Sequence, residues 1–173
     1  MISFKNKFYL YFATRDTAMK IQMIGVATAP VRTNFNRDQW TQAADKPILY
    51  PQLDWEGACI EGASVIQRGN RLFMFYAGAY NNAPQQIGLA VSKDGVTWER
   101  VSQVPFVPNG KPGEWNSSES GHPHIFRIKM EKRTCFTRAT TITAKPGCSR
   151  RKRCCGMGKP SNVKVENEKK CVL

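Results

Sequence analysis

Glu61 and His122 are the two side chains of this chain that are best suited to acid–base chemistry. Glu61 stands in front of Gly62 and a short apolar run at 63–66, and His122 follows Gly121. A carboxyl group can give a proton to a leaving group or take one from water, and an imidazole changes charge near neutral pH. Position alone leaves a second interpretation open for both residues, because a glutamate before a strand often faces solvent and a histidine beside a proline is common in polar loops.

The residues near the C-terminus suggest two other chemistries, metal binding and nucleic-acid binding. No histidine follows His124. The cysteines that could bind zinc lack a paired C-x-x-C spacing; they are Cys148, Cys154, Cys155 and Cys171. Zinc-finger spacing is therefore not met. The basic run at 150–153 could neutralise phosphates, but Phe136 is the sole aromatic residue of 127–173 and no nucleic-acid-binding signature is present. The sequence therefore disfavours a nucleic-acid partner.

Charge divides the chain into two regions. Residues 1–126 hold 12 Lys+Arg and 10 Asp+Glu, whereas residues 127–173 hold 14 and 3. If the codons for 132–139 are assembled one base earlier, they can encode Leu-Phe-Tyr-Gln-Gly, which has the same shape as Met-Phe-Tyr-Ala-Gly at 74–78. We therefore expect the basic, Cys-rich tail 127–173 to be translated out of frame, with a disordered basic tail as the alternative.

The composition favours a folded chain outside the membrane. Hydrophobic residues make up 41% of the sequence and aromatic residues 10%, enough to bury a core. No window approaches the roughly 18 to 20 apolar residues of a membrane-spanning helix. The first residues lack the apolar stretch of a signal peptide. Because a missing N-terminus would have removed such a signal, the sequence leaves the compartment unknown.

Residues 1–126 contain a repeat. Three pairs of segments align: 2–13 with 66–77, 24–30 with 87–93, and 62–68 with 121–127. Trp40 corresponds to Trp98 in the first two copies, and Ser120 aligns with Glu61 in the third. The third pair shows that a further copy begins late in the chain.

Each repeat predicts four short strands. In the best-preserved copy, strands are expected over 63–66, 72–77, 87–92 and 97–101, with turn residues at 68–70 and an Asp-Gly hairpin turn at 94–95. Four short strands with a recurring Gly and a recurring Trp are typical of a β-propeller blade. A β-sandwich with accidental similarity is the alternative.

Three motifs taken together resemble glycoside hydrolase family 43 and its relatives, which are five-bladed β-propellers. They are IEGASVIQRGNRLFMFYAG at 60–78, IGLAVSKDGVTW at 87–98 and SGHPHIF at 120–126. The resemblance covers residues 1–126 and implies an all-β fragment of about two blades and part of a third. It also implies hydrolysis of O-glycosidic bonds with inversion, on an oligo- or polysaccharide.

The resemblance assigns roles to individual residues. An inverting glycosidase needs an acid and a base about 6.5 to 9.5 Å apart, and Glu61 would be the general acid. His122 would line the central cavity, contact the substrate, and be linked to a bound calcium ion or to the surroundings of the acid. Tyr80 and Asn81, in a polar loop, and Trp55 are candidate sugar contacts. No cofactor is required apart from that calcium, and members of the family are often secreted or periplasmic.

The general base has no counterpart in the alignment. It should be an aspartate on the first strand of the first repeat, but the position that aligns with Glu61 falls before Met1. Asp16 aligns with Tyr80 and therefore cannot serve as the general base. We therefore expect this chain to be an inactive fragment of a glycosidase, with a non-catalytic carbohydrate-binding or interaction propeller as the alternative.

Overall fold

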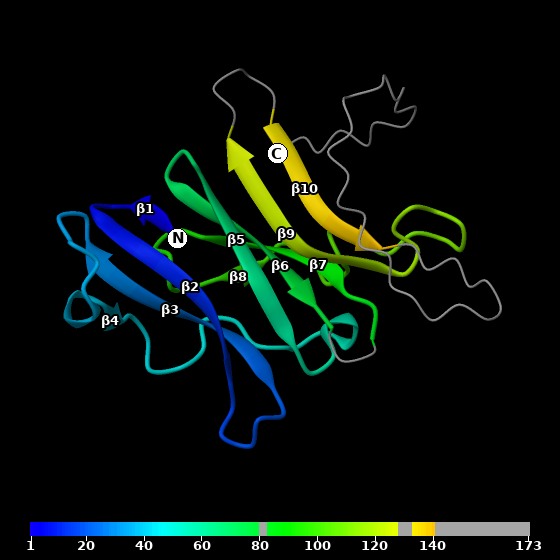
Figure 1. The fold of residues 1–173 in the computed structure, drawn as a ribbon, viewed down its shortest axis with the longest axis horizontal. Coiled ribbons are helices and arrows are strands. Elements are labelled where there is room, and N and C mark those ends of the chain that lie inside the picture. Colours follow the sequence, from blue (N-terminus) through cyan, green and yellow to red (C-terminus); the bar gives the residue numbers. More distant parts are fainter. Residues whose placement is uncertain (80–82, 128–132, 141–173) are drawn as a thin grey trace. The chain divides into compact units, whose positions relative to one another are not determined.

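The computed structural model describes residues 1–79, 83–127 and 133–140, which lie within the first of the chain's two compact units, Met1–Ile142 (Figure 1). The strands are β1 (Ile2–Phe4), β2 (Lys7–Arg15), β3 (Gln22–Pro30), β4 (Thr41–Gln42), β5 (Ile60–Arg68), β6 (Arg71–Gly78), β7 (Gln86–Ser92), β8 (Glu99–Arg100), β9 (Glu119–Arg127) and β10 (Arg133–Thr140). Two single-turn 3₁₀ helices, η1 (Arg37–Gln39) and η2 (Asp54–Glu56), interrupt the loops. The described residues are therefore all-β, as predicted, and they contain no helix long and apolar enough to cross a membrane.

The predicted repeat is present as two antiparallel sheets of the same topology. The first has the order β1-β2-β3-β4 and the second β5-β6-β7-β8. The opening hairpins match in register, since Phe4 pairs with Lys7 as Arg68 pairs with Arg71. Each sheet is thus one four-stranded meander, which is the form of a propeller blade.

A third sheet begins with β9 and β10, which pair antiparallel. β9 starts at the place that the repeat predicts for the first strand of a third copy. β10 lies after residue 126, where the sequence analysis placed the end of the blade-like part, and Arg133 pairs with Arg127. Strand pairing thus continues on both sides of that expected boundary.

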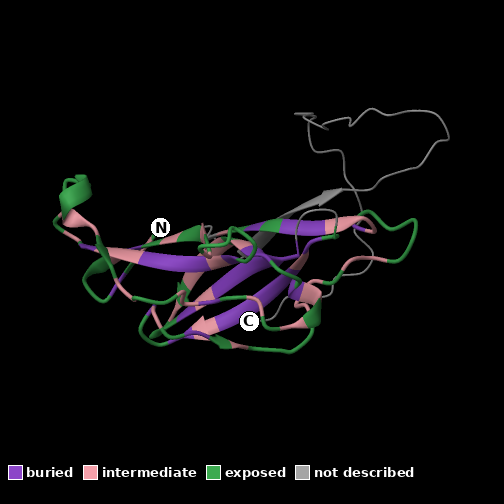
Figure 2. Ribbon diagram, turned by 90° about the horizontal axis from the view of Figure 1, so that it is seen from below, coloured by how far each residue is buried: buried purple, intermediate pink, exposed green. Residues whose placement is uncertain are grey.

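Two apolar clusters join successive sheets. In the first, Tyr9 and Ile24 of the first sheet and Leu72 and Met74 of the second belong to one buried cluster. In the second, Phe75 and neighbouring apolar residues of the second sheet pack with Ile125 of β9. Because neighbouring side chains of a strand point to opposite faces, the run of buried residues from Met74 to Gly78 means that β6 is buried on both faces. Figure 2 shows that buried residues are concentrated in the strands.

The turn that follows β7 connects the first two sheets. The Asp94 carboxylate accepts hydrogen bonds from the backbone nitrogens of Val96 (2.8 Å) and Thr97 (2.7 Å). Burial alone would raise the pKa of Asp94, but these hydrogen bonds hold it below its ordinary value. The carbonyl oxygen of Gly95 accepts a hydrogen bond from the Tyr11 hydroxyl of β2 at 3.0 Å. The Asp-Gly turn predicted from the sequence is therefore also a joint between two blades.

A buried ion pair stabilises the second sheet. The side chain of Glu56 is fully buried, and its Oε1 lies 2.8 Å from Nε of Arg100 on β8. The same carboxylate accepts hydrogen bonds from the Tyr76 hydroxyl and from the backbone nitrogens of Gln52 and Leu53. Burial alone would raise the pKa of Glu56, but the hydrogen bonds from Arg100, Gln52 and Tyr76 outweigh it and lower the pKa. Nothing in the repeat pattern predicted this pair.

Candidate functional site

Glu61 lies near the start of β5, the first strand of the second sheet. Its Cα pairs with Ala77 of β6, and the register then shifts before Ser64. This bulge includes Gly62, whose φ of +63° is in the left-handed region that favours glycine. A bulge re-aims the side chains beside it. The Glu-Gly pair that the sequence singled out is therefore a local irregularity at the beginning of a blade.

Side chains from three sheets surround the Glu61 carboxylate. Gln22, at the start of β3, donates from Nε2 to Oε2 at 2.7 Å. Gln85, just before β7, donates from Nε2 to Oε1 at 2.8 Å. His122 of β9 places Nε2 3.7 Å from Oε1, which makes an ion pair when the imidazole is protonated. The first strands β5 and β9 therefore approach each other at Glu61, and the two amides come from the beginnings of the third strands of the first two sheets.

Exposure separates the members of this site. The Glu61 side chain is 16% exposed and that of His122 is 47% exposed. Gln22 and Gln85 are buried. A molecule from solvent would therefore meet His122 and one part of the Glu61 carboxylate, with the two amides behind them.

His122 has an unusual backbone. Its φ is +46°, a value that is uncommon for a residue with a side chain. Such outliers persist only where the surrounding structure over-determines them. The Cα of His122 lies 3.7 Å from the position of a Cβ on Gly62, so the two backbones pass closely. The close approach of β5 and β9 thus brings His122 to Glu61.

Ser120 aligns with Glu61 in the repeat, and its hydroxyl bonds elsewhere than to the Glu61 carboxylate. It is fully buried, and its hydroxyl accepts a hydrogen bond from Asn116 at 2.8 Å. Its backbone nitrogen donates to the carbonyl oxygen of Gln85 at 2.9 Å. Ser120 therefore links β9 to the second sheet.

The predicted sugar contacts have different outcomes. Trp55 stacks on Tyr76, with ring centroids 6.0 Å apart, and its Nε1 donates to the carbonyl oxygen of Gln103 at 3.1 Å. Its contacts are thus with the framework of the second sheet and the loop after β8. Tyr80 and Asn81 lie outside the described residues.

A calcium ion near His122 is the metal that the resemblance implies. Calcium takes six to eight oxygen ligands, usually with several carboxylates among them. In the described ranges of the chain, no group of three or more His, Cys, Asp or Glu side chains gathers at His122 or elsewhere. Calcium near His122 therefore stays a prediction, and no step below uses a metal.

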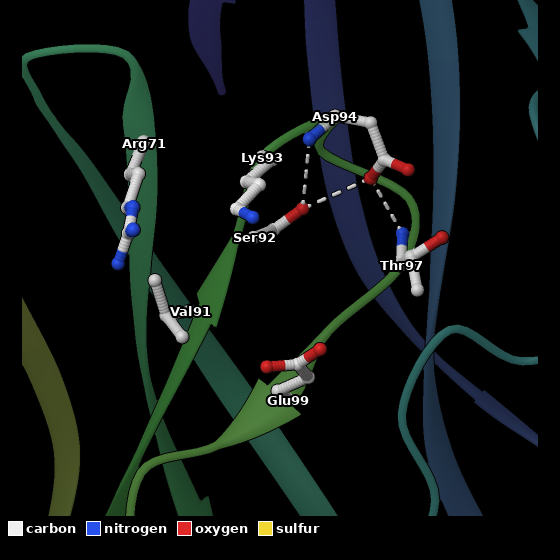
Figure 3. A pocket seen from close by; sticks show the side chains of 7 residues that line it. All are labelled: Arg71, Val91, Ser92, Lys93, Asp94, Thr97 and Glu99. Carbon is white, nitrogen blue, oxygen red and sulfur yellow. Dashed lines mark hydrogen bonds between the residues drawn. The ribbon is translucent and has the colours of Figure 1, made fainter.

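A hollow on the second sheet is separate from Glu61 (Figure 3). It lies beside the turn after β7 and is lined by Arg71, Val91, Ser92, Lys93, Asp94, Thr97 and Glu99. The Asp94 carboxylate that faces it is already engaged by its own turn. The hollow is thus a feature of the turn and does not extend the Glu61 site.

Sequence reasoning missed the two glutamines. Gln22 was not singled out, and Gln85 belongs to the polar loop from which only Tyr80 and Asn81 were chosen. A signal was available, because the alignment of 24–30 on 87–93 also places Gln22 opposite Gln85. A polar side chain at the same place in two repeats, next to a strand that is otherwise apolar, indicates a buried hydrogen bond.

Four-stranded antiparallel sheets in series, with a glutamate where side chains of successive sheets meet, define a propeller-type, glycoside hydrolase-like domain. Over 112 residues the chain is 30% identical to beta-1,2-mannobiose phosphorylase of Thermoanaerobacter sp. (strain X514), covering 56% of this chain and 36% of that protein. It is 26% identical over 117 residues to alpha-L-arabinofuranosidase 43 of Humicola insolens, covering 62% and 23%. The solved structure of alpha-L-arabinofuranosidase from Lactobacillus brevis matches with a TM-score of 0.59 and 21% identity, covering 84% and 46%.

These comparisons confirm the resemblance to family 43-like propeller enzymes and the fold class. No sequence model of a protein family matches the chain. The chain spans less than half the length of each of the three proteins named above. What a complete protein of this kind does is therefore a matter for proposal.

Proposed function

We propose that this chain carries the general acid, Glu61, of a propeller that cleaves O-glycosidic bonds in an oligo- or polysaccharide. The observation that carries the proposal is the position of Glu61, a partly exposed carboxylate reached by side chains of three successive sheets. Two similar proteins are named for an arabinofuranoside and for mannobiose, which supports a carbohydrate substrate.

In this reaction the protonated carboxyl of Glu61 gives its proton to the glycosidic oxygen as the bond from the anomeric carbon to that oxygen breaks. With inversion, water attacks the opposite face of the sugar, and a base must take a proton from that water. The side chains in contact with Glu61 are Gln22, Gln85 and His122, and none is a carboxylate. His122 stands beside the acid and not across a sugar ring from it. Among the residues that the structure describes, none therefore takes the place of the base, and we expect the chain by itself not to hydrolyse glycosides.

The purified 173-residue chain should not hydrolyse p-nitrophenyl α-L-arabinofuranoside or β-D-mannoside faster than its Glu61→Gln variant does. The expected result is the same background release of nitrophenol from both. A rate that Glu61→Gln abolishes would mean that the chain contains the base and would contradict the proposed inactivity. The assay is repeated with inorganic phosphate, an anion that needs no base, and a Glu61-dependent release that requires phosphate would make the reaction a phosphorolysis.

A second candidate function is carbohydrate binding without catalysis. The observation that favours it is that both oxygens of Glu61 accept amide hydrogen bonds, which suits a carboxylate held in place. The two candidates differ in the genomic DNA just upstream of the codon for Met1. An aspartate codon at the position answering Glu61 favours the enzyme. If it is present, the longer gene product should lose roughly 10²–10⁴-fold of its activity on Glu61→Gln, whereas a binding module has no such activity to lose.

We also propose that the codons after Phe126 are read out of frame. The repeat places the second strand of the third copy at 131–136, and β10 (Arg133–Thr140) occupies that place. Restoring one base in the codons for 126–133 should give an aromatic strand that ends in glycine and should remove the cysteine cluster. Sequencing the gene is the test. A reading frame that stays intact and encodes no further blade would return the basic tail to consideration as a genuine part of the protein.

A further inference from the structure

Gln22 and Gln85 occupy the same place in the two repeats and bind the same carboxylate. Each stands at the beginning of the third strand of its sheet, one at the start of β3 and one just before β7. Gln22 reaches forward to the next sheet, whereas Gln85 reaches back to the first strand of its own sheet. The Glu61 carboxylate thus has one amide on each oxygen.

Both glutamines are fixed in position by their backbones. The nitrogen of Gln22 donates to the carbonyl oxygen of Ala58 at 2.9 Å, and the carbonyl oxygen of Gln85 accepts from Ser120 at 2.9 Å. These bonds tie the first sheet to the second and the second to β9. The amides therefore approach Glu61 from backbone that is itself held at two sheet junctions.

Gly121 provides the space that Gln85 needs. A Cβ built on Gly121 would overlap Oε1 of Gln85 and lie 3.0 Å from its Cβ and Cδ. Gly121 does not have a positive φ, so the backbone there would accept alanine. The reason for glycine at this position is the amide of Gln85.

One atom of the site has no partner. Oε1 of Gln85 is buried and accepts no hydrogen bond from the described residues. If the side-chain amide of Gln85 rotated by half a turn, its oxygen would face Glu61 and accept a hydrogen bond from the protonated carboxyl group. In the present orientation its N–H group donates to the ionised form. Gln85 can thus bond Glu61 in both protonation states, and the rotation breaks no hydrogen bond at Oε1.

We propose that Gln22 and Gln85 are positioning residues that hold the carboxyl group of Glu61 between successive blades, and that Gly121 is required to seat Gln85. The inference rests on the proposed role of Glu61. It explains how a general acid can be oriented at a junction of three sheets. The titratable group that faces Glu61 is His122 from β9, while β6 contributes Ala77 opposite it and the other two neighbours are amides.

The test is the ¹³C NMR signal of the Glu61 carboxyl carbon in the full chain at one fixed neutral pH, assigned as the signal that Glu61→Gln removes. Gln85→Leu and Gly121→Ala should each move this signal, because the carboxyl group loses a hydrogen-bond partner. Gln22→Leu should act in the same direction. The matched control is Gln86→Leu, since the Gln86 side chain accepts a hydrogen bond from the backbone nitrogen of Asn109 and its loss should leave the Glu61 signal unchanged.

A second pair of variants keeps the test decisive if a leucine variant does not fold. Gln85→Glu keeps the size of the side chain but removes its amide donor, so it should move the Glu61 signal as Gln85→Leu does. Gln86→Glu should leave the Glu61 signal unchanged. An unchanged Glu61 signal in the variants at 85 and 121, or an equal change in the variants at 86, would overturn the proposal. Because no sugar is needed, this result is independent of whether the chain or its gene product cleaves glycosides.

Discussion

Replacing Arg100 with methionine should lower the free energy of unfolding by about 3 to 5 kcal/mol, the effect of leaving a buried charge without its partner. Arg100 donates to both oxygens of Glu56 at 2.8 Å, and the Glu56 side chain is fully enclosed. Methionine keeps the length of the arginine stem but removes every donor. Urea unfolding of both proteins, followed by tryptophan fluorescence, measures the difference.

The pH dependence identifies the cause. In the unsubstituted chain the pKa of Glu56 lies below its unfolded value of about 4.3, so its stabilising contribution is present above that pH and is lost as the pH falls through the folded value. In Arg100→Met the buried carboxyl is easier to protonate, so the loss in stability should shrink as the pH is lowered. The control is Glu56→Gln combined with Arg100→Met, which removes both charges and should cost much less. A single variant as stable as the parent chain would show that the ion pair contributes little.

Replacing Gly95 with alanine should destabilise the chain by about 2 to 4 kcal/mol, from backbone strain and overpacking together. The φ of Gly95 is +85°, and a Cβ there would lie 2.6 Å from Cε1 of Tyr9. Tyr9 is buried in the cluster that joins the first sheet to the second, so its ring has little room to move. The expected consequence is a weakened joint between the two blades, measured as a lower midpoint of urea unfolding.

Gly113→Ala separates the two contributions. Gly113 has a φ of +94° but nothing within 4 Å of a Cβ, so alanine there introduces strain without a collision. It should destabilise by only about 1 to 2 kcal/mol. Equal losses at 95 and 113 would contradict the role of Tyr9 and leave backbone strain as the whole effect.

The strands were predictable because their signals are local. Alternating side chains, an Asp-Gly turn and aromatic segments act over a few residues, and the same signals occur in both repeats. The order of strands within each sheet follows from short connections, since antiparallel neighbours need only a tight turn. The alignment of 2–13 on 66–77 therefore predicted both sheets, even though β1 retains only Ile2–Phe4.

The site was predictable only in part. Glu61 and His122 were chosen from motifs, and the structure brings them to 3.7 Å. Trp55 was chosen as a sugar contact, and this stays a prediction. The structure adds that its half-buried ring stacks on Tyr76, a contact between residues 21 positions apart that no local pattern predicted.

The amino-acid sequence by itself determined the blade repeat, the turns and the candidate acid, because each depends on neighbouring residues. Only the tertiary structure decided which polar groups meet. Gln22 and Gln85 come to opposite oxygens of Glu61, and Glu56 finds Arg100, because the packing of one sheet on the next sets distances between residues that are far apart in the chain. Burial then requires each of these hydrogen bonds and ion pairs, because a polar group removed from water is costly unless it has a partner.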